Sequence, residues 1–149
     1  MKNFFLTLTL LTLIIQNLVA QDAKVKYQNV SQKQMQEQNL EIATLAAKEM
    51  SKGLPKKIDK YTTLRNIQNE GPTLVYTFVI NSGAKSDEAI RKEDHSRMQK
   101  AVTQGICQSS ERFLKAGVNI SYIYMSVKTN KLLFRFDITK DKCNYLAPR

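Results

Sequence analysis

Two stretches of this sequence place four large apolar residues at every second position. They are Leu74, Tyr76, Phe78 and Ile80 within residues 73–81, and Leu132, Phe134, Phe136 and Ile138 within residues 131–139. Side chains alternate between the two faces of a β-strand, so each stretch predicts a strand with one strongly apolar face. Such a face must be covered, and helices packed on one side of a sheet are the economical cover.

Two helices are predicted to provide that cover. Ser31 and Gln34 match a capping box, and an apolar stripe at helical spacing follows to Met50. We expect this helix over residues 32–52, because Gly53 and Pro55 are typical stop signals. A second helix is expected from an N-cap at Ser86 through residue 115, ending at Gly117.

Two further strands complete the predicted fold. Residues 58–68 have a mixed pattern rich in β-branched and aromatic residues, and residues 118–127 are apolar on both faces, as in a central strand. The sequence therefore predicts an α+β fold, a two-layer sandwich in the order α-β-β-α-β-β. Its sheet has four antiparallel strands and its cover is two helices, forming a single domain over residues 31–149.

The first twenty residues predict a secretory signal peptide. Met1-Lys2-Asn3 is positively charged, residues 4–15 are apolar apart from threonines, and the segment ends on a small residue, Ala20. A retained membrane anchor is the alternative, but Gln16 interrupts the apolar run before the roughly 20 residues that a span needs. We expect cleavage after residue 20, a flexible lead-in over residues 21–30, no later membrane span, and a periplasmic or secreted product.

Export changes the interpretation of the two cysteines. Cys107 and Cys143 are the only cysteines of the chain, and in an oxidising compartment they predict a disulfide. A bridge closing about 35 intervening residues stabilises a fold by about 4 kcal/mol in the chain-entropy model.

One pattern of structural residues resembles a known group of proteins. Its first part is Leu54-Pro55-x-x-Ile58-Asp59-x-x-Thr62-x-Leu64 followed by Leu74-x-Tyr76-x-Phe78, and its second part is Cys107-x4-Arg112-x-Leu114-x-x-Gly117-x4-Tyr122 followed by Cys143. The pattern, over about residues 54–143, resembles small exported proteins of Gram-negative bacteria that have unknown function and a C-terminal Cys…Cys α+β domain. The resemblance implies the fold and the disulfide, and no activity.

No catalytic or metal-binding set is predicted. Asp94-His95-Ser96 contains the residue types of a hydrolase triad, but neighbours on a helix point about 100° apart and cannot form the relay. One histidine with two distant cysteines does not match metal-ligand spacing, and no cofactor is expected. The alternative is a small secreted hydrolase with a dispersed site, for which the candidates are Glu88, Glu93, His95 and Tyr124.

The strongest remaining signal is the positive charge. The chain has 23 Lys+Arg and 13 Asp+Glu, a net charge of +10, which becomes 22 − 13 = +9 without residues 1–20. An exported chain seldom meets nucleic acid, so the expected partner is an acidic protein or an anionic envelope component. The candidate basic surface comprises Lys52, Lys56, Lys57, Lys60, Lys128, Lys131, Arg135, Lys140 and Lys142.

These observations favour a non-enzymatic exported interaction protein, either an accessory factor of a secretion apparatus or an immunity-type inhibitor. A basic surface that is merely solvated is the simpler alternative for the lysines.

Overall fold

The structure, a computed structural model, describes residues 31–146, and of residues 144–146 only the backbone. The predicted signal peptide and lead-in lie outside the described residues. In the described part, no helix combines the length and the apolar character that a membrane crossing requires.

Helix α2 (Gln32–Met50) begins with the predicted capping box. The Ser31 hydroxyl accepts a hydrogen bond from the Gln34 backbone N–H at 3.2 Å, and the Gln34 side chain accepts from the Ser31 N–H at 2.9 Å. Two of the four N–H groups that a helix start leaves unpaired are thereby satisfied. The prediction of this helix is confirmed.

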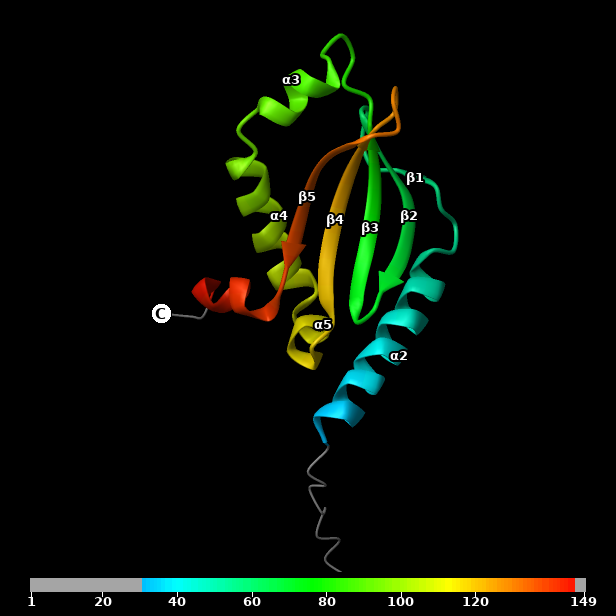
Figure 1. Cartoon of the computed structure of the whole chain (residues 1–149), viewed down its shortest axis with the longest axis vertical. Helices are drawn as coiled ribbons and strands as arrows, with labels where there is room; N and C mark the ends of the chain where they lie inside the picture. Colours follow the sequence, from blue (N-terminus) through cyan, green and yellow to red (C-terminus); the bar gives the residue numbers. More distant parts are fainter. Residues whose placement is uncertain (1–30, 147–149) are drawn as a thin grey trace, which may run out of the picture.

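Five strands form one sheet, in the spatial order β1-β2-β3-β4-β5 (Figure 1). They are β1 (Lys56–Lys57), β2 (Thr62–Glu70), β3 (Thr73–Ile80), β4 (Asn119–Ser126) and β5 (Leu132–Ile138). The pairs β1–β2, β2–β3 and β4–β5 are antiparallel, but β3 and β4 are parallel. The prediction of a four-stranded antiparallel sheet is therefore wrong in strand number and in one pairing direction.

The parallel pair results from a long helical crossover. Three helices connect the end of β3 to the start of β4, so that β4 runs in the same direction as β3. Apolar alternation is the same for parallel and antiparallel neighbours, so the pattern in residues 118–127 could not show the direction. Strand β1 was missed because it consists of two exposed lysines with no apolar period.

The predicted second helix is three helices: α3 (Asp87–Lys92), α4 (Ser96–Ser109) and α5 (Glu111–Ala116). The first break lies at Glu93, which is extended, and at Asp94, whose carboxylate accepts from the Ser96 N–H and hydroxyl. Short polar side chains compete with helical hydrogen bonds in this way. With four α-helices and the 3₁₀-helix η2 (Lys140–Leu146) in the described part, the predicted α-β-β-α-β-β order is also wrong.

The core forms where one face of the sheet meets the helices. Tyr76 lies opposite Tyr122, which lies opposite Phe136, so the apolar sides of three strands share one face. Ala43 and Ala47 of α2, Ile106 of α4 and Leu114 of α5 pack on this face. The two alanines carry almost no side chain, which allows α2 to lie close to the strands. Helix α2 and the crossover helices α4 and α5 therefore cover the same side of the sheet (Figure 1).

Leu132, the first apolar residue of the alternating stretch 131–139, does not face the core. The β4–β5 register shifts between Tyr124 and Met125, so Leu133 becomes buried while Leu132 is 49% exposed. An extra residue in one strand makes the side chains beyond it point to the opposite face of the sheet. The expectation that Leu132 faces the core is wrong for this reason.

The disulfide joins Cys107 on α4 to Cys143 on η2, with their Cα atoms 5.5 Å apart. The predicted pairing is confirmed, and it ties the crossover helices to the segment after the last strand. A bridge in this place constrains two parts of the chain that share no strand pairing.

Candidate functional site

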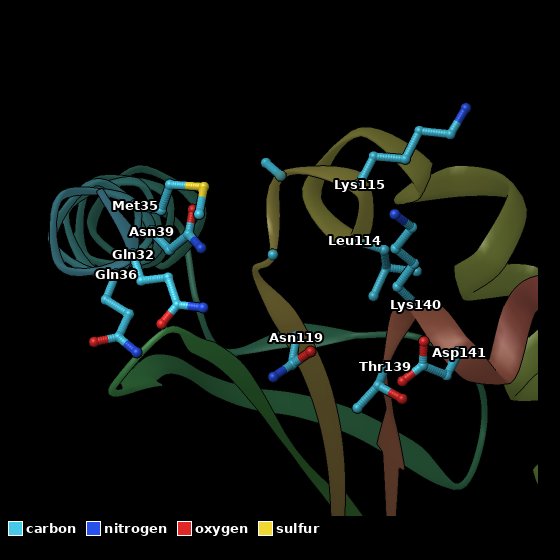
Figure 2. A pocket seen from close by; sticks show the side chains of 12 residues that line it. Gln32, Met35, Gln36, Asn39, Leu114, Lys115, Asn119, Thr139, Lys140 and Asp141 are labelled. Carbon is cyan, nitrogen blue, oxygen red and sulfur yellow. The ribbon is translucent and has the colours of Figure 1, made fainter. Parts of the chain in front are cut away.

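An open hollow of about 660 Å³ lies between α2 and α5 at the end of the sheet where β4 begins (Figure 2). Residues of α2 form one wall, and residues of α5 and the start of η2 form the other. Asn119, the first residue of β4, lies between the walls. The lining residues are Gln32, Met35, Gln36, Asn39, Leu114, Lys115, Ala116, Gly117, Asn119, Thr139, Lys140 and Asp141.

The α5 wall depends on how that helix ends. Gly117 has φ +90°, its N–H donates to the Leu114 carbonyl at 3.1 Å, and the Val118 N–H donates to the Phe113 carbonyl at 2.9 Å. This pair of bonds around a left-handed residue is a Schellman cap, for which glycine is preferred. The predicted helix end at Gly117 is confirmed. The cap turns the chain directly into β4 and brings Gly117 against Asn39 of α2.

Most of the lining residues have polar or charged side chains, set among apolar surface. Gln32, Gln36, Asn39 and Asn119 supply amide groups that both donate and accept. Met35 adds an apolar side chain that is 46% exposed. Flexible thioethers pack against irregular surfaces, so Met35 can adapt to ligands of different shape.

Two lysines and one aspartate supply the charge of the hollow. Lys115 is paired with Glu111 at 2.6 Å, and Lys140 and Asp141 follow each other at the start of η2. In Figure 2 the Lys115 side chain extends away from the other labelled residues.

The nine residues of the predicted basic surface lie in four places. Lys52, Lys56, Lys57 and Lys60 lie between the C-terminus of α2 and the start of β2. Lys128 and Lys131 lie in the β4–β5 hairpin, and Lys140 and Lys142 lie on η2, where only Lys140 reaches the hollow. Arg135 is separate from all of these, on the sheet face that does not carry the core. The fold therefore does not bring the nine side chains together into one surface, and their binding role stays a prediction.

Several of these cations already have intramolecular partners. Lys52 is 2.6 Å from Glu49, and Arg135 is 2.8 Å from Asp137 and 3.6 Å from Glu70. Lys128 donates to the Gly83 carbonyl, and Lys142 donates to the Asp137 carbonyl.

Arg135 belongs to a polar network on the second face of the sheet. Asp137 accepts hydrogen bonds from the Ser121 hydroxyl at 2.7 Å and from Arg135 Nε at 2.8 Å. Burial opposes the ionisation of Asp137, but these hydrogen bonds outweigh it and the pKa of Asp137 is lowered. Glu70 on β2 completes the network, which connects β5 and β4 with β2.

The four candidates for a dispersed hydrolase site are engaged elsewhere, and none lines the hollow. Glu88 pairs with Lys92 at 2.7 Å, and Glu93 pairs with Lys85 at 2.6 Å. His95 is half-buried at the N-cap of α4, with its ring centroid 4.1 Å from that of Phe134.

Tyr124 is the fourth candidate, and it lies in an aromatic cluster under the helices. Its ring is 5.0 Å from Phe78 and 4.7 Å from Phe134. Burial raises the pKa of Tyr124, and likewise raises the pKa of Tyr76 to about 12 and that of Tyr122. Tyr124 is thus part of the core and does not reach the hollow.

Metal binding finds no support in the part of the chain that the structure describes, where no three His, Cys, Asp or Glu side chains are grouped to hold an ion.

Sequence reasoning missed the residues that line the α2 wall. Gln32, Gln36 and Asn39 recur at four- and three-residue spacing beside the apolar stripe, which places them on one side of the helix. That polar stripe was a usable signal. Its counterpart on α5 could not be found, because only the tertiary fold brings Gly117 and Asn39 together.

The comparisons with known proteins agree with this fold. A family described as a domain of unknown function, DUF8479, matches residues 37–134. The chain belongs to the DUF8479 family. The match begins within α2 and extends into β5, so it includes Asn39 of the α2 wall and all of α5. The finer residue pattern over residues 54–143 stays a prediction. No curated protein sequence matches the chain.

Three solved structures share the fold of this DUF8479 protein. A protein from Pseudomonas aeruginosa described as secreted has a TM-score of 0.66 at 18% identity, covering 74% of this chain and 96% of its own. The pilotin EpsS of the Vibrio vulnificus type 2 secretion system has a TM-score of 0.62 at 14% identity, covering 78% and 99%. The type II secretion system pilotin AspS of Vibrio cholerae has a TM-score of 0.57 at 19% identity, covering 74% and 97%. At these identities the likeness shows the fold alone.

Proposed function

We propose that this DUF8479 protein is a non-enzymatic accessory protein of a secretion system in the bacterial envelope. In this proposal the hollow between α2 and α5 binds a segment of a partner protein. The signal peptide expected at residues 1–20 would deliver the protein to the periplasm.

The observation that carries the proposal is the hollow itself, built on a fold that occurs in two secretion-system pilotins. Its amide-rich walls suit the backbone groups of a polypeptide, which need one donor and one acceptor for each residue. Met35 provides an apolar contact beside them. The lining contains no paired nucleophile and base, which supports binding without catalysis.

The overall charge supports an acidic partner. The net charge of 22 − 13 = +9 that remains without residues 1–20 raises the rate at which an acidic protein meets the surface, and salt weakens this attraction. Lys140 is the lysine of the predicted basic surface that reaches the hollow, so it is the candidate for a direct contact with a partner carboxylate.

Site-specific photocrosslinking in intact cells tests the proposal. A photoreactive residue at Gln36, which lines the hollow, should form a crosslink to one envelope protein that mass spectrometry identifies as a secretion component. Glu41 is the matched control, because it is exposed on the same helix and lies about 140° around its axis from Gln36.

Equal crosslinking at both positions, or none at Gln36, would contradict the proposal. A crosslinked toxin would instead support an immunity-type role. A crosslink that K140E abolishes would assign Lys140 to the contact.

A further inference from the structure

A second surface follows the C-terminus of α2, whereas the hollow lies at the N-terminal end of this helix. It consists of Lys56, Lys57, Ile58, Lys60 and Tyr61, which form strand β1 and the turn into β2; we call it the basic edge. β1 is the first strand in the sheet order, so these residues lie at a margin of the sheet (Figure 1). Lys56 and Lys57 are successive strand residues, so their side chains flank this margin on both sides.

The lysines of the basic edge keep their charge available. Among the carboxylates of residues 31–146, none lies within ion-pair distance of Lys56, Lys57 or Lys60. Asp59 is the one acidic residue in this segment, and its carboxylate is turned to the backbone. It accepts from the Tyr61 N–H at 2.7 Å and from the Thr62 N–H at 2.8 Å.

Those hydrogen bonds have two consequences. They keep Asp59 ionised, since they lower its pKa, and they hold the turn that presents Lys60 and Tyr61. With three lysines and one carboxylate, the segment has a net charge of +2.

Two apolar side chains extend into solvent among these charges. Ile58 is 51% exposed and Tyr61 is 56% exposed. Lys60 Nζ lies 5.3 Å from the centre of the Tyr61 ring, so the cation and the aromatic ring form one unit. The basic edge therefore combines lysines that have no carboxylate partner with exposed apolar surface from Ile58 and Tyr61.

We propose that the basic edge docks on an anionic lipid surface. Lysines act as flexible point charges and can approach many headgroups, whereas defined recognition of a single carboxylate or phosphate favours the planar arginine fork. The basic edge contains three lysines and no arginine. Tyrosine has an apolar ring and a polar tip, which suits the level of the headgroups, and Ile58 can contact the acyl boundary beneath them.

The position of the basic edge allows both surfaces to work at once. The residues of α2 that line the hollow lie in its first two turns, while the basic edge follows its C-terminus. The 19 residues of α2 span about 28 Å. A protein docked on lipid through the basic edge would therefore keep the hollow accessible to a protein partner.

Vesicle binding of the purified full chain tests the inference. Binding is measured by co-flotation with vesicles of phosphatidylcholine alone and with vesicles containing 30% phosphatidylglycerol. An apolar leader would bind both kinds, so the quantity of interest is the preference for the anionic vesicles. We expect a preference of at least about tenfold at low salt that disappears in 1 M NaCl, where the Debye length falls to about 3 Å.

Matched variants locate the surface. The triple variant K56Q/K57Q/K60Q should lose the preference by at least about tenfold, while K33Q/K92Q/K100Q removes the same charge from exposed helix positions and should retain most of it. I58S and Y61S should each weaken binding severalfold. V127S is their control, because Val127 is 50% exposed in the β4–β5 hairpin. Circular dichroism confirms that each variant is folded.

Equal loss in both triple variants would overturn the inference, because binding would then follow net charge and not this surface. An absence of preference for anionic vesicles in the folded wild type would overturn it as well. If K56Q/K57Q/K60Q kept vesicle binding but lost the crosslink at Gln36, the basic edge would belong to the protein interface.

Discussion

The side chain of Asn39 on α2 lies directly over Gly117, the residue that ends α5. A Cβ atom at position 117 would be 2.5 Å from Asn39 Nδ2, closer than non-bonded atoms can approach. Both residues line the hollow, so its two walls come close together at this point. Gly117 thus has two reasons to be glycine: its positive φ and the proximity of a second helix.

Substitution of Gly117 separates these two reasons. G117A should lower the free energy of unfolding by about 2 kcal/mol, because alanine is strained at φ +90° and its Cβ meets Asn39. Gly53 is the matched control: its φ is +80°, but nothing lies within 4 Å of its Cβ position. G53A should therefore lower the free energy of unfolding by only about 1 kcal/mol. Urea unfolding at pH 7 measures both variants.

A double variant completes that test. N39A/G117A should recover part of the loss, since the shortened side chain leaves room for the new methyl group. Additive losses from N39A and G117A would contradict the crowding and leave only backbone strain.

Removal of the disulfide should destabilise the fold substantially. The bridge joins residues 36 apart in the sequence, for which the chain-entropy model gives about 4 kcal/mol. We expect the variant C107S/C143S to unfold at a markedly lower urea concentration than the oxidised protein. Reducing agent should shift the wild type towards the variant and leave the variant unchanged. An unchanged midpoint in reduced wild type would contradict this prediction.

Alkaline pH should destabilise the protein through Tyr76. Burial raises its pKa from 10.0 to about 12, and its hydroxyl lies 3.6 Å from the sulfur of Met50. Between these two pKa values the unfolded chain releases the proton while the folded chain keeps it, so stability present below pH 10 is lost as pH rises towards 12. By pH 12, the fall in the free energy of unfolding that is due to Tyr76 is at most about 2–3 kcal/mol.

Absorbance of tyrosinate at 295 nm and urea unfolding measure this effect. The variant Y76F should show a smaller fall in stability between pH 10 and pH 12, although it also loses the contact with Met50. An equal alkaline fall in Y76F would assign the effect to other groups.

The network around Asp137 should contribute stability that depends on acid pH. The hydrogen bonds from Ser121 and Arg135 favour the carboxylate, and the pKa of Asp137 is lowered as a result. The contribution is present above the ordinary aspartate pKa and is lost as pH falls through the lowered value. Since Asp137 is exposed, D137N should cost only about 0.5–1 kcal/mol at pH 7.

Urea unfolding at several pH values checks this prediction. The difference between D137N and wild type should shrink as the pH falls below 4. A difference that is constant with pH would mean that the carboxylate charge is not what stabilises the network.

The local chemistry of the sequence was sufficient for several elements. The reciprocal hydrogen bonds of Ser31 and Gln34 need only four neighbouring residues, and so the start of α2 was predictable. The same is true of the α5 end at Gly117, and of the alternation in β3. Two cysteines in an exported chain have only each other as intramolecular partners, which made the Cys107–Cys143 pairing predictable as well.

The tertiary structure alone decided how these elements are arranged. The direction of β4 depends on where the crossover helices return the chain, and a strand's apolar period carries no information about the direction of its neighbour. Asp94 broke the second helix by accepting from Ser96, and the same polar residue could equally have stayed solvated on a continuous helix. The hollow depends on Asn39 and Gly117, which are far apart in the sequence, so no local pattern could reveal it. Short-range hydrogen bonding and periodicity determine elements, whereas packing between distant segments determines surfaces.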